Sequence, residues 1–183
     1  VFNLMIDYFK YGLKSKWIIS KPSKKDVLIY DGLPKIDFLL KKQKIAYFDK
    51  RNSVNLFVLF KTFLNDGFKN IKENYIKNYF NLVSPKVVMT GIDNNLSFFK
   101  LKYIYNKPKY VCVQGSLRDK FFINQCQKYY RDNNKKLFAD YFFIYGKNDL
   151  IKLKKYISTK FVVSGSFRNN LFKKKVKNRK LKE

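Results

Sequence analysis

The stretch PKVVMTGIDNN, residues 85–95, carries the pattern that decides the fold. A proline precedes a short apolar run without polar alternation, and the run ends in Gly91, followed by Asp93, Asn94 and Asn95. Such a continuous run is typical of a strand covered on both faces, as in a parallel sheet. The polar residues behind it predict a turn that leads into a helix.

The same pattern recurs along the chain. The predicted strands are residues 26–31, 45–49, 86–91, 110–115, 141–146 and 161–165. Apolar stripes at helical spacing lie between them, at 56–63, 71–82, 98–105, 121–130 and 150–157, and Ser53 is the predicted N-cap of the first. Strands that alternate with helices predict βαβ units. We therefore expect an α/β, Rossmann-like three-layer domain over residues 26–171, with a parallel sheet of about six strands.

Two basic segments flank this predicted domain. Residues 1–25 combine apolar residues at roughly helical spacing with lysines, which predicts an N-terminal amphipathic helical arm. Such a helix lies either on an anionic membrane or against its own domain, and the sequence leaves both open. Residues 172–183 form a lysine-rich tail that we expect to be frayed.

The amino-acid composition excludes several kinds of catalytic site. The 183 residues are 46% hydrophobic and 19% aromatic, enough for the core of one domain. The chain has no histidine, which excludes Ser-His-Asp and Cys-His catalysis and any histidine base. Cys112 and Cys126 do not make a CxxC pair, so no zinc site is expected, and Cys112 is predicted to be a small core residue. With no signal-peptide pattern and no run of apolar residues long enough to span a bilayer, we expect a cytoplasmic location.

The charge is strongly positive. Forty lysines and arginines face 13 acidic residues, for a net charge of +27. Three explanations stay open: AT-rich codon bias that supplies solvating lysines, attraction to an anionic membrane surface, or nucleic-acid binding. Only five of the basic residues are arginine, which weighs against nucleic acid as a partner.

Candidate binding residues follow the predicted strands, because ligands of open parallel sheets bind beyond the carboxyl ends of the strands. They are Asp31, Arg51, Ser53, Asp93, Asn94, Asn95, Gln114, Gly115, Arg118, Ser166, Arg168 and Asn169. The sequence shows neither a GxxxxGK[ST] phosphate loop nor a GxGxxG after the first strand, which argues against a P-loop kinase and ordinary NAD binding.

Each candidate also has a structural reading. The Asp93 carboxylate either binds or deprotonates a sugar hydroxyl, or else Asp93 or Asn95 caps the next helix. Asp31 has the same two readings, with a plain Asp-Gly turn as the structural one. Arg51 binds phosphate or makes a salt bridge. The backbone at Gln114 and Gly115 offers either an anion site or a tight turn.

Four blocks in this order resemble a family of bacterial surface-carbohydrate biosynthesis proteins. They are residues 85–95 with the FFKLK segment at 98–102, QGSLR at 114–118, DYFFIYG at 140–146 and GSFRNN at 165–170. The chain departs from the family in two places. The asparagine between the glutamine and the glycine is absent after Gln114, and the turn at 50–53 keeps Arg51 and Ser53 but lacks an acidic residue.

The resemblance implies a two-domain glycosyltransferase of the GT-B type that needs no metal. The N-terminal domain holds the acceptor, and the nucleotide-sugar donor binds mainly to the C-terminal domain. The chain corresponds to the N-terminal half, so we expect it to lack transferase activity by itself. Asp93 is the first candidate for the base and Asp31 the second, while Arg51, Arg118 and Arg168 are candidates for phosphate. The expected partners are a nucleotide-activated sugar, a lipid-linked glycan and the inner face of the membrane; the alternative is a basic binding module for anionic glycan, membrane or nucleic acid.

Overall fold

Six parallel strands form the central sheet in a computed structural model that describes residues 15–32, 40, 43–49, 52–117 and 119–166. The strands are β2 (Val27–Tyr30), β3 (Ile45–Phe48), β5 (Val87–Thr90), β6 (Lys109–Val113), β7 (Leu137–Ile144) and β8 (Ile157–Val163). They lie in the order β3-β2-β5-β6-β7-β8, and every neighbouring pair is parallel. The predicted α/β class and six-stranded parallel sheet are confirmed, and the domain is Rossmann-like.

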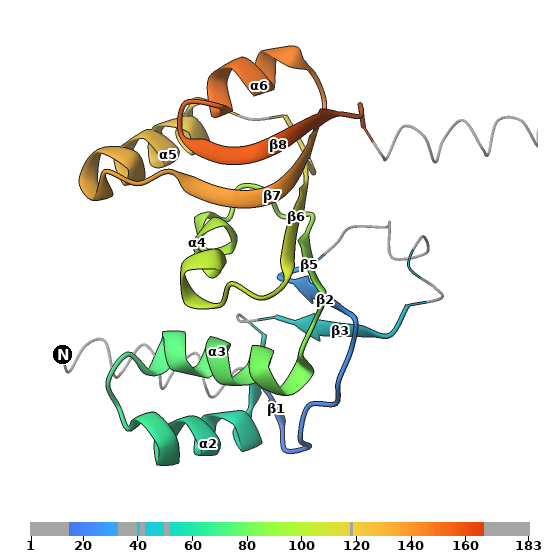
Figure 1. The fold of residues 1–183 in the computed structure, drawn as a ribbon, viewed down its shortest axis with the longest axis vertical. Helices are drawn as coiled ribbons and strands as arrows, with labels where there is room; N and C mark the ends of the chain where they lie inside the picture. Colours follow the sequence, from blue (N-terminus) through green and yellow to red (C-terminus); the bar gives the residue numbers. More distant parts are fainter. Residues whose placement is uncertain (1–14, 33–39, 41–42, 50–51, 118, 167–183) are drawn as a thin grey trace, which may run out of the picture.

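Five helices are described; the last four line one side of this sheet, and the first packs on the second. They are α2 (Leu56–Asp66), α3 (Ile71–Val83), α4 (Leu96–Ile104), α5 (Lys120–Asn133) and α6 (Lys147–Leu153). Figure 1 shows α3, α4 and α5 stacked along the same face. The main core lies between these helices and the strands; its largest fully buried side chains include Tyr30, Phe80, Phe98, Phe99, Tyr110, Phe122 and Phe142. The aromatic content noted in the sequence therefore fills the core.

The opposite face of the sheet has a second, smaller core. Successive strand residues point to opposite faces, so Leu28 and Tyr30 belong to the main core and Ile29, between them, does not. Ile29 and Val113 pack with Leu40, Met89 and other partly buried residues. The continuous apolar runs of the sequence thus correspond to strands with apolar contacts on both faces.

Several predicted boundaries are wrong. The helix predicted for 150–157 ends at Leu153, and Ile157 already starts β8. β7 begins at Leu137, four residues before the predicted start, because Leu137 and Ala139 are buried along the same strand. Ser53 does not cap α2: it lies in β4 (Ser53–Asn55), and Asn55 is the N-cap, whose side chain accepts the Val58 N–H at 3.0 Å.

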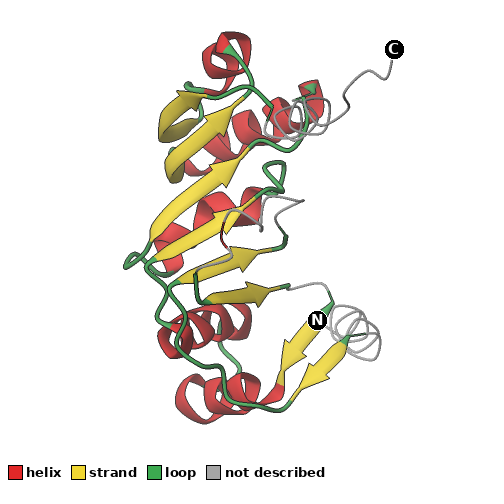
Figure 2. Cartoon of the chain, turned by 90° about the vertical axis from the view of Figure 1, so that its right-hand side faces the viewer, coloured by secondary structure: helices red, strands yellow, loops and turns green. Residues whose placement is uncertain are grey.

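A small two-stranded sheet joins the start of the chain to the domain. β1 (Lys16–Ile18) pairs in parallel with β4, and Figure 2 shows the two arrows set apart from the main sheet. Asn55 strengthens the junction by donating its side-chain N–H to the Ser20 carbonyl at 2.9 Å. Residues 16–18 of the predicted helical arm therefore form a strand, and residues 1–14 lie outside the described part of the chain. The predicted tail at 172–183 also lies outside it.

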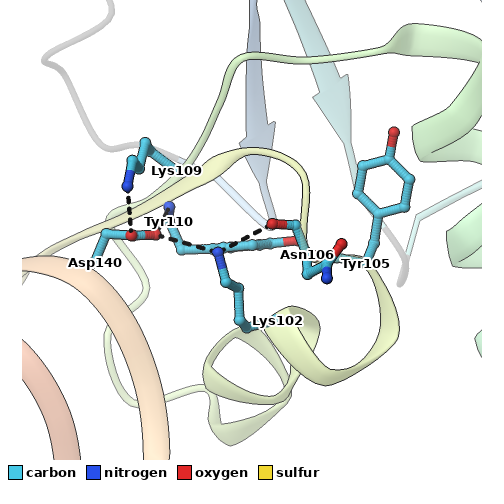
Figure 3. Close-up of polar contacts among 6 residues, drawn as sticks. All are labelled: Lys102, Tyr105, Asn106, Lys109, Tyr110 and Asp140. Atoms are coloured by element: carbon cyan, nitrogen blue, oxygen red, sulfur yellow. Dashed lines mark hydrogen bonds and ion pairs between the residues drawn. The ribbon is translucent and has the colours of Figure 1, made fainter.

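A polar network fixes the pairing of β6 and β7. The register against β8 shifts between Phe138 and Tyr141, where β7 carries an extra residue. Asp140 lies in this irregularity; its carboxylate accepts the Tyr110 backbone N–H at 2.8 Å and pairs with Lys109 at 3.2 Å. Lys102 of α4 approaches the same carboxylate at 4.0 Å (Figure 3). Asp140, part of the third family-like block, thus has a structural role.

Candidate functional site

The strand order places the candidate site between β2 and β5. The chain enters the sheet at β2, adds β3 on one side, and then crosses back to add β5 on the other side. This is the point where the strand order reverses, and ligands of open α/β sheets bind there, beyond the carboxyl ends of the strands. The loops in question begin at Asp31 and Gly91, directly after the two strands.

The loop after β2 is tightly turned. Asp31 has a φ of 56° and Gly32 a φ of 117°, both in the left-handed region, which glycine adopts freely and aspartate tolerates. The Asp31 N–H donates to the Phe48 carbonyl at 2.9 Å, and the Gly32 carbonyl accepts the Gly91 N–H at 2.9 Å. The turn is therefore held between β3 on one side and the loop after β5 on the other.

A chain of side-chain hydrogen bonds continues from Asp31. Asn95 donates its side-chain N–H to Asp31 Oδ2, and its own Oδ1 caps α4 by accepting the Ser97 N–H at 3.1 Å and hydroxyl at 2.7 Å. The Ser97 hydroxyl lies 3.0 Å from the Tyr30 hydroxyl. Burial raises the pKa of Tyr30 above its ordinary value, so this phenol stays neutral at physiological pH. The structural reading of Asn95 as a cap is confirmed, and Asn95 also joins α4 to Asp31.

Asp93 joins the loops after β5 and β6. Its side chain is 1% exposed, and Oδ1 accepts the Gly115 N–H at 2.9 Å. A Cβ at Gly115 would lie 2.6 Å from the Gly91 carbonyl oxygen, so only glycine allows the two loops to approach this closely. Asp93 does not cap α4, since Asn95 holds that position.

Gln114 joins the loops after β6 and β7. Its Oε1 accepts the Tyr145 N–H at 2.6 Å, and its Nε2 donates to Asp149 Oδ2 at 2.9 Å and to the Ser116 carbonyl at 3.0 Å. Gln114 is 3% exposed, so its amide is engaged inside the protein. Asp149, in the first turn of α6, was not among the predicted residues. The sequence signal that could have indicated Asp149 is its position two residues after the Gly146-Lys147 turn, which follows a predicted strand.

Other predicted residues lie apart from this network. Ser53 donates its hydroxyl to the Asp49 carbonyl at 3.0 Å within the β3–β4 turn. Ser166 follows β8, which is three strands from β5, or about 14 Å across the sheet. Asn94 is exposed at the edge of the network, where a ligand can reach it, and so is Ser116, which was not among the predicted residues. Arg51, Arg118, Arg168 and Asn169 lie outside the described residues.

The network gives the site a definite electrostatic character. Three buried carboxylates, Asp31, Asp93 and Asp149, are spread along the carboxyl edge of the sheet, in a chain whose net charge is +27. Each accepts a hydrogen bond from an amide donor, which is how buried carboxylates are stabilised. Among the described residues there is no group of three His, Cys, Asp or Glu side chains able to hold a metal.

Comparison of the chain with protein-family models, curated proteins and solved structures finds no match. In the part of the chain that the structure describes, no helix has the length and apolar character needed to cross a bilayer.

Proposed function

We propose that the chain is the acceptor-side domain of a glycosyltransferase-like enzyme of bacterial surface-polysaccharide synthesis. The enzyme transfers a sugar or a related unit from a nucleotide-activated donor to a lipid-linked glycan. It works in the cytoplasm, at the inner face of the membrane where such a glycan is anchored. The donor binds mainly to a second domain, and no further cofactor takes part.

One observation supports this proposal above the others. Three of the four family-like sequence blocks, which are separated along the chain, are joined by hydrogen bonds at one edge of the sheet. Asp93 of the first block accepts from Gly115 of the second, and Gln114 of the second accepts from Tyr145 of the third. A binding edge built in this way, beside the reversal of strand order, suits a polar, hydroxyl-rich ligand.

The proposed chemistry is a displacement at the anomeric carbon of the donor. An acceptor hydroxyl oxygen forms the new bond to that carbon while the bond to the donor's phosphate oxygen breaks, and the hydroxyl proton passes to a carboxylate. Asp93 is the first candidate for this carboxylate and Asp31 the second. Asn94 and Ser116, which are exposed beside them, are candidates for hydrogen bonds to acceptor hydroxyls.

Paired substitutions at Asp93 separate catalysis from positioning. Asp93→Asn keeps an Oδ1 that can accept the Gly115 N–H but removes the base, whereas Asp93→Ala removes both. Both substitutions are made in the protein expressed from its whole natural reading frame. If Asp93 is the base, both variants lose about 100-fold or more in acceptor-dependent release of nucleotide. The measurement is kcat for that release, with nucleotide sugar and membranes that carry lipid-linked glycan.

An Asp93→Asn variant with unchanged kcat would assign Asp93 a positioning role and leave Asp31 as the base, which Asp31→Asn tests in the same assay. If the unsubstituted protein binds anionic glycan but never releases nucleotide from any nucleotide sugar, the transferase proposal fails. The alternative, a basic binding module, then takes its place.

A further inference from the structure

An apolar surface on α2 has no cover in the described part of the chain. We define the α2 surface as Phe57, Phe60, Phe63 and Leu64 of α2 together with Phe68, which follows the Gly67 C-cap of the helix. Phe60 is 64% exposed, Leu64 66% and Phe68 76%. The Phe63 and Phe68 rings meet edge to face at a centroid distance of 4.5 Å, so these two side chains are in contact.

The geometry of α2 explains why this surface faces outward. Val58 and Thr62 are the buried residues of the helix, and they lie one turn apart on its inner side. Phe57, Phe60 and Leu64 fall on the opposite side at about 100° per residue. The main contacts of α2 in the described part of the chain are with α3, β1 and β4, so it forms an outer layer below the main sheet (Figure 1). Exposed aromatic residues gathered on one helix mark an interaction surface.

The segments that form and contact α2 are basic, as the whole chain is. Residues 15–26 and 56–83, which make β1, its connector, α2 and α3, contain eight lysines and three acidic residues. Trp17 and Ile19 are also exposed, on or directly after β1, the strand that contacts α2. Phenylalanine and tryptophan beside lysines are the composition of segments that lie in the headgroup region of anionic membranes.

We propose that the α2 surface is the site at which the protein docks on an anionic phospholipid membrane. Its aromatic side chains enter the interface and the neighbouring lysines face the headgroups. A second copy of the chain is a poorer occupant, because each copy carries a net charge of +27 and lysines around the surface would face lysines. The inference deepens the membrane location contained in the proposed function by naming the surface and the lipid charge it requires.

Vesicle flotation tests the docking surface without involving glycan transfer. The full-length protein is mixed with vesicles of phosphatidylglycerol and phosphatidylcholine, or of phosphatidylcholine alone. We expect it to float only with the anionic vesicles, and less so as salt is raised. The double variant Phe60→Asn/Leu64→Asn should bind at least about tenfold more weakly. The matched control is Phe121→Asn/Ile151→Asn, which removes two exposed apolar side chains from α5 and α6 and should bind normally.

Trp17, the single tryptophan among these 183 residues, provides a second readout. In the control Phe121→Asn/Ile151→Asn, Trp17 fluorescence should shift to shorter wavelength on the anionic vesicles and should be quenched by brominated lipid. In Phe60→Asn/Leu64→Asn we expect neither the shift nor the quenching. Equal binding by the two double variants would overturn the proposal, since it would assign binding to lysines elsewhere. Absence of vesicle binding by the unsubstituted protein would also overturn the proposal. If that protein were then a dimer in solution and Phe60→Asn/Leu64→Asn a monomer, a second copy of the chain would be the occupant of the α2 surface.

These outcomes are independent of the proposed function, because the vesicles carry no glycan. Docking with no transfer activity would contradict the transferase proposal only, and transfer with no docking would contradict the α2 surface only.

Discussion

At the scale of single residues, Gly115 shows how closely the loops of the candidate site approach one another. Its N–H donates to Asp93 Oδ1, and a Cβ added to it would lie 2.6 Å from the Gly91 carbonyl oxygen, which leaves no room for a side chain. A side chain of any size must push the loop after β6 away from the loop after β5.

We therefore expect Gly115→Ala to lower the free energy of unfolding by about 1–3 kcal/mol, the usual cost of overpacking. The measurement is urea denaturation followed by circular dichroism. Gly146→Ala is the matched control, because an added Cβ there meets nothing within 4 Å and φ is −161°, an extended value open to alanine. Equal stability of Gly115→Ala and Gly146→Ala would contradict the close approach.

At the scale of elements, Asp140 fixes β6 against β7 on the side of the molecule away from the candidate site. Its carboxylate satisfies the Tyr110 N–H at the bulge of β7, and two lysines complete the group (Figure 3). The backbone hydrogen bond matters more than the ion pair, since the Lys109 side chain is 68% exposed and its pairing is screened by water.

Asp140→Ala should thus cost about 1–3 kcal/mol of unfolding free energy, because it leaves the Tyr110 N–H without its acceptor. Lys109→Ala should change the same quantity by less than about 0.5 kcal/mol. Denaturant unfolding of the two variants checks the difference, and a larger loss in Lys109→Ala than in Asp140→Ala would reverse the assignment.

At the scale of the whole molecule, the main core contains ionisable groups that must remain neutral. Burial raises the pKa of the Cys126 thiol to about 12, and it raises the pKa of Tyr30 and Tyr110 as well. A thiol of the unfolded chain ionises near pH 9, whereas the folded one holds its proton to about pH 12. Ionisation therefore favours the unfolded state within this window, and stability falls as pH rises through it.

Comparison of the wild type with Cys126→Ala isolates this effect from the titration of the many lysines. The wild type should be the more stable at pH 7, and its advantage in free energy of unfolding should shrink as pH rises from about 9 to about 12. Thermal unfolding across this range measures the advantage. A constant difference would mean that the thiol is not buried as described. Consistently, neither Cys112 nor Cys126 should react with a thiol reagent until the protein unfolds.

The sequence alone determined the fold class. Continuous apolar runs such as residues 87–90 are typical of strands covered on both faces, and the helical stripes between them predict a parallel sheet covered by helices. The sequence also located the loops of the candidate site, since Asp31, Asp93 and Gln114 lie in the loops that follow strands whose carboxyl ends must share an edge. The resemblance to glycosyltransferases, which no match to a known protein tests, stays a proposal.

Only the tertiary structure decided what these residues contact. Asp93 meets Gly115 and Gln114 meets Asp149 over separations of 22 and 35 residues, and no local pattern encodes such pairs. Likewise, the apolar stripe predicted over residues 56–63 is typical of a core-facing helix. The helix instead lies on α3 and β1, and Phe60 and Phe63 of this stripe are exposed. Periodicity determines which side chains share a face, whereas the packing of distant elements determines whether that face is covered.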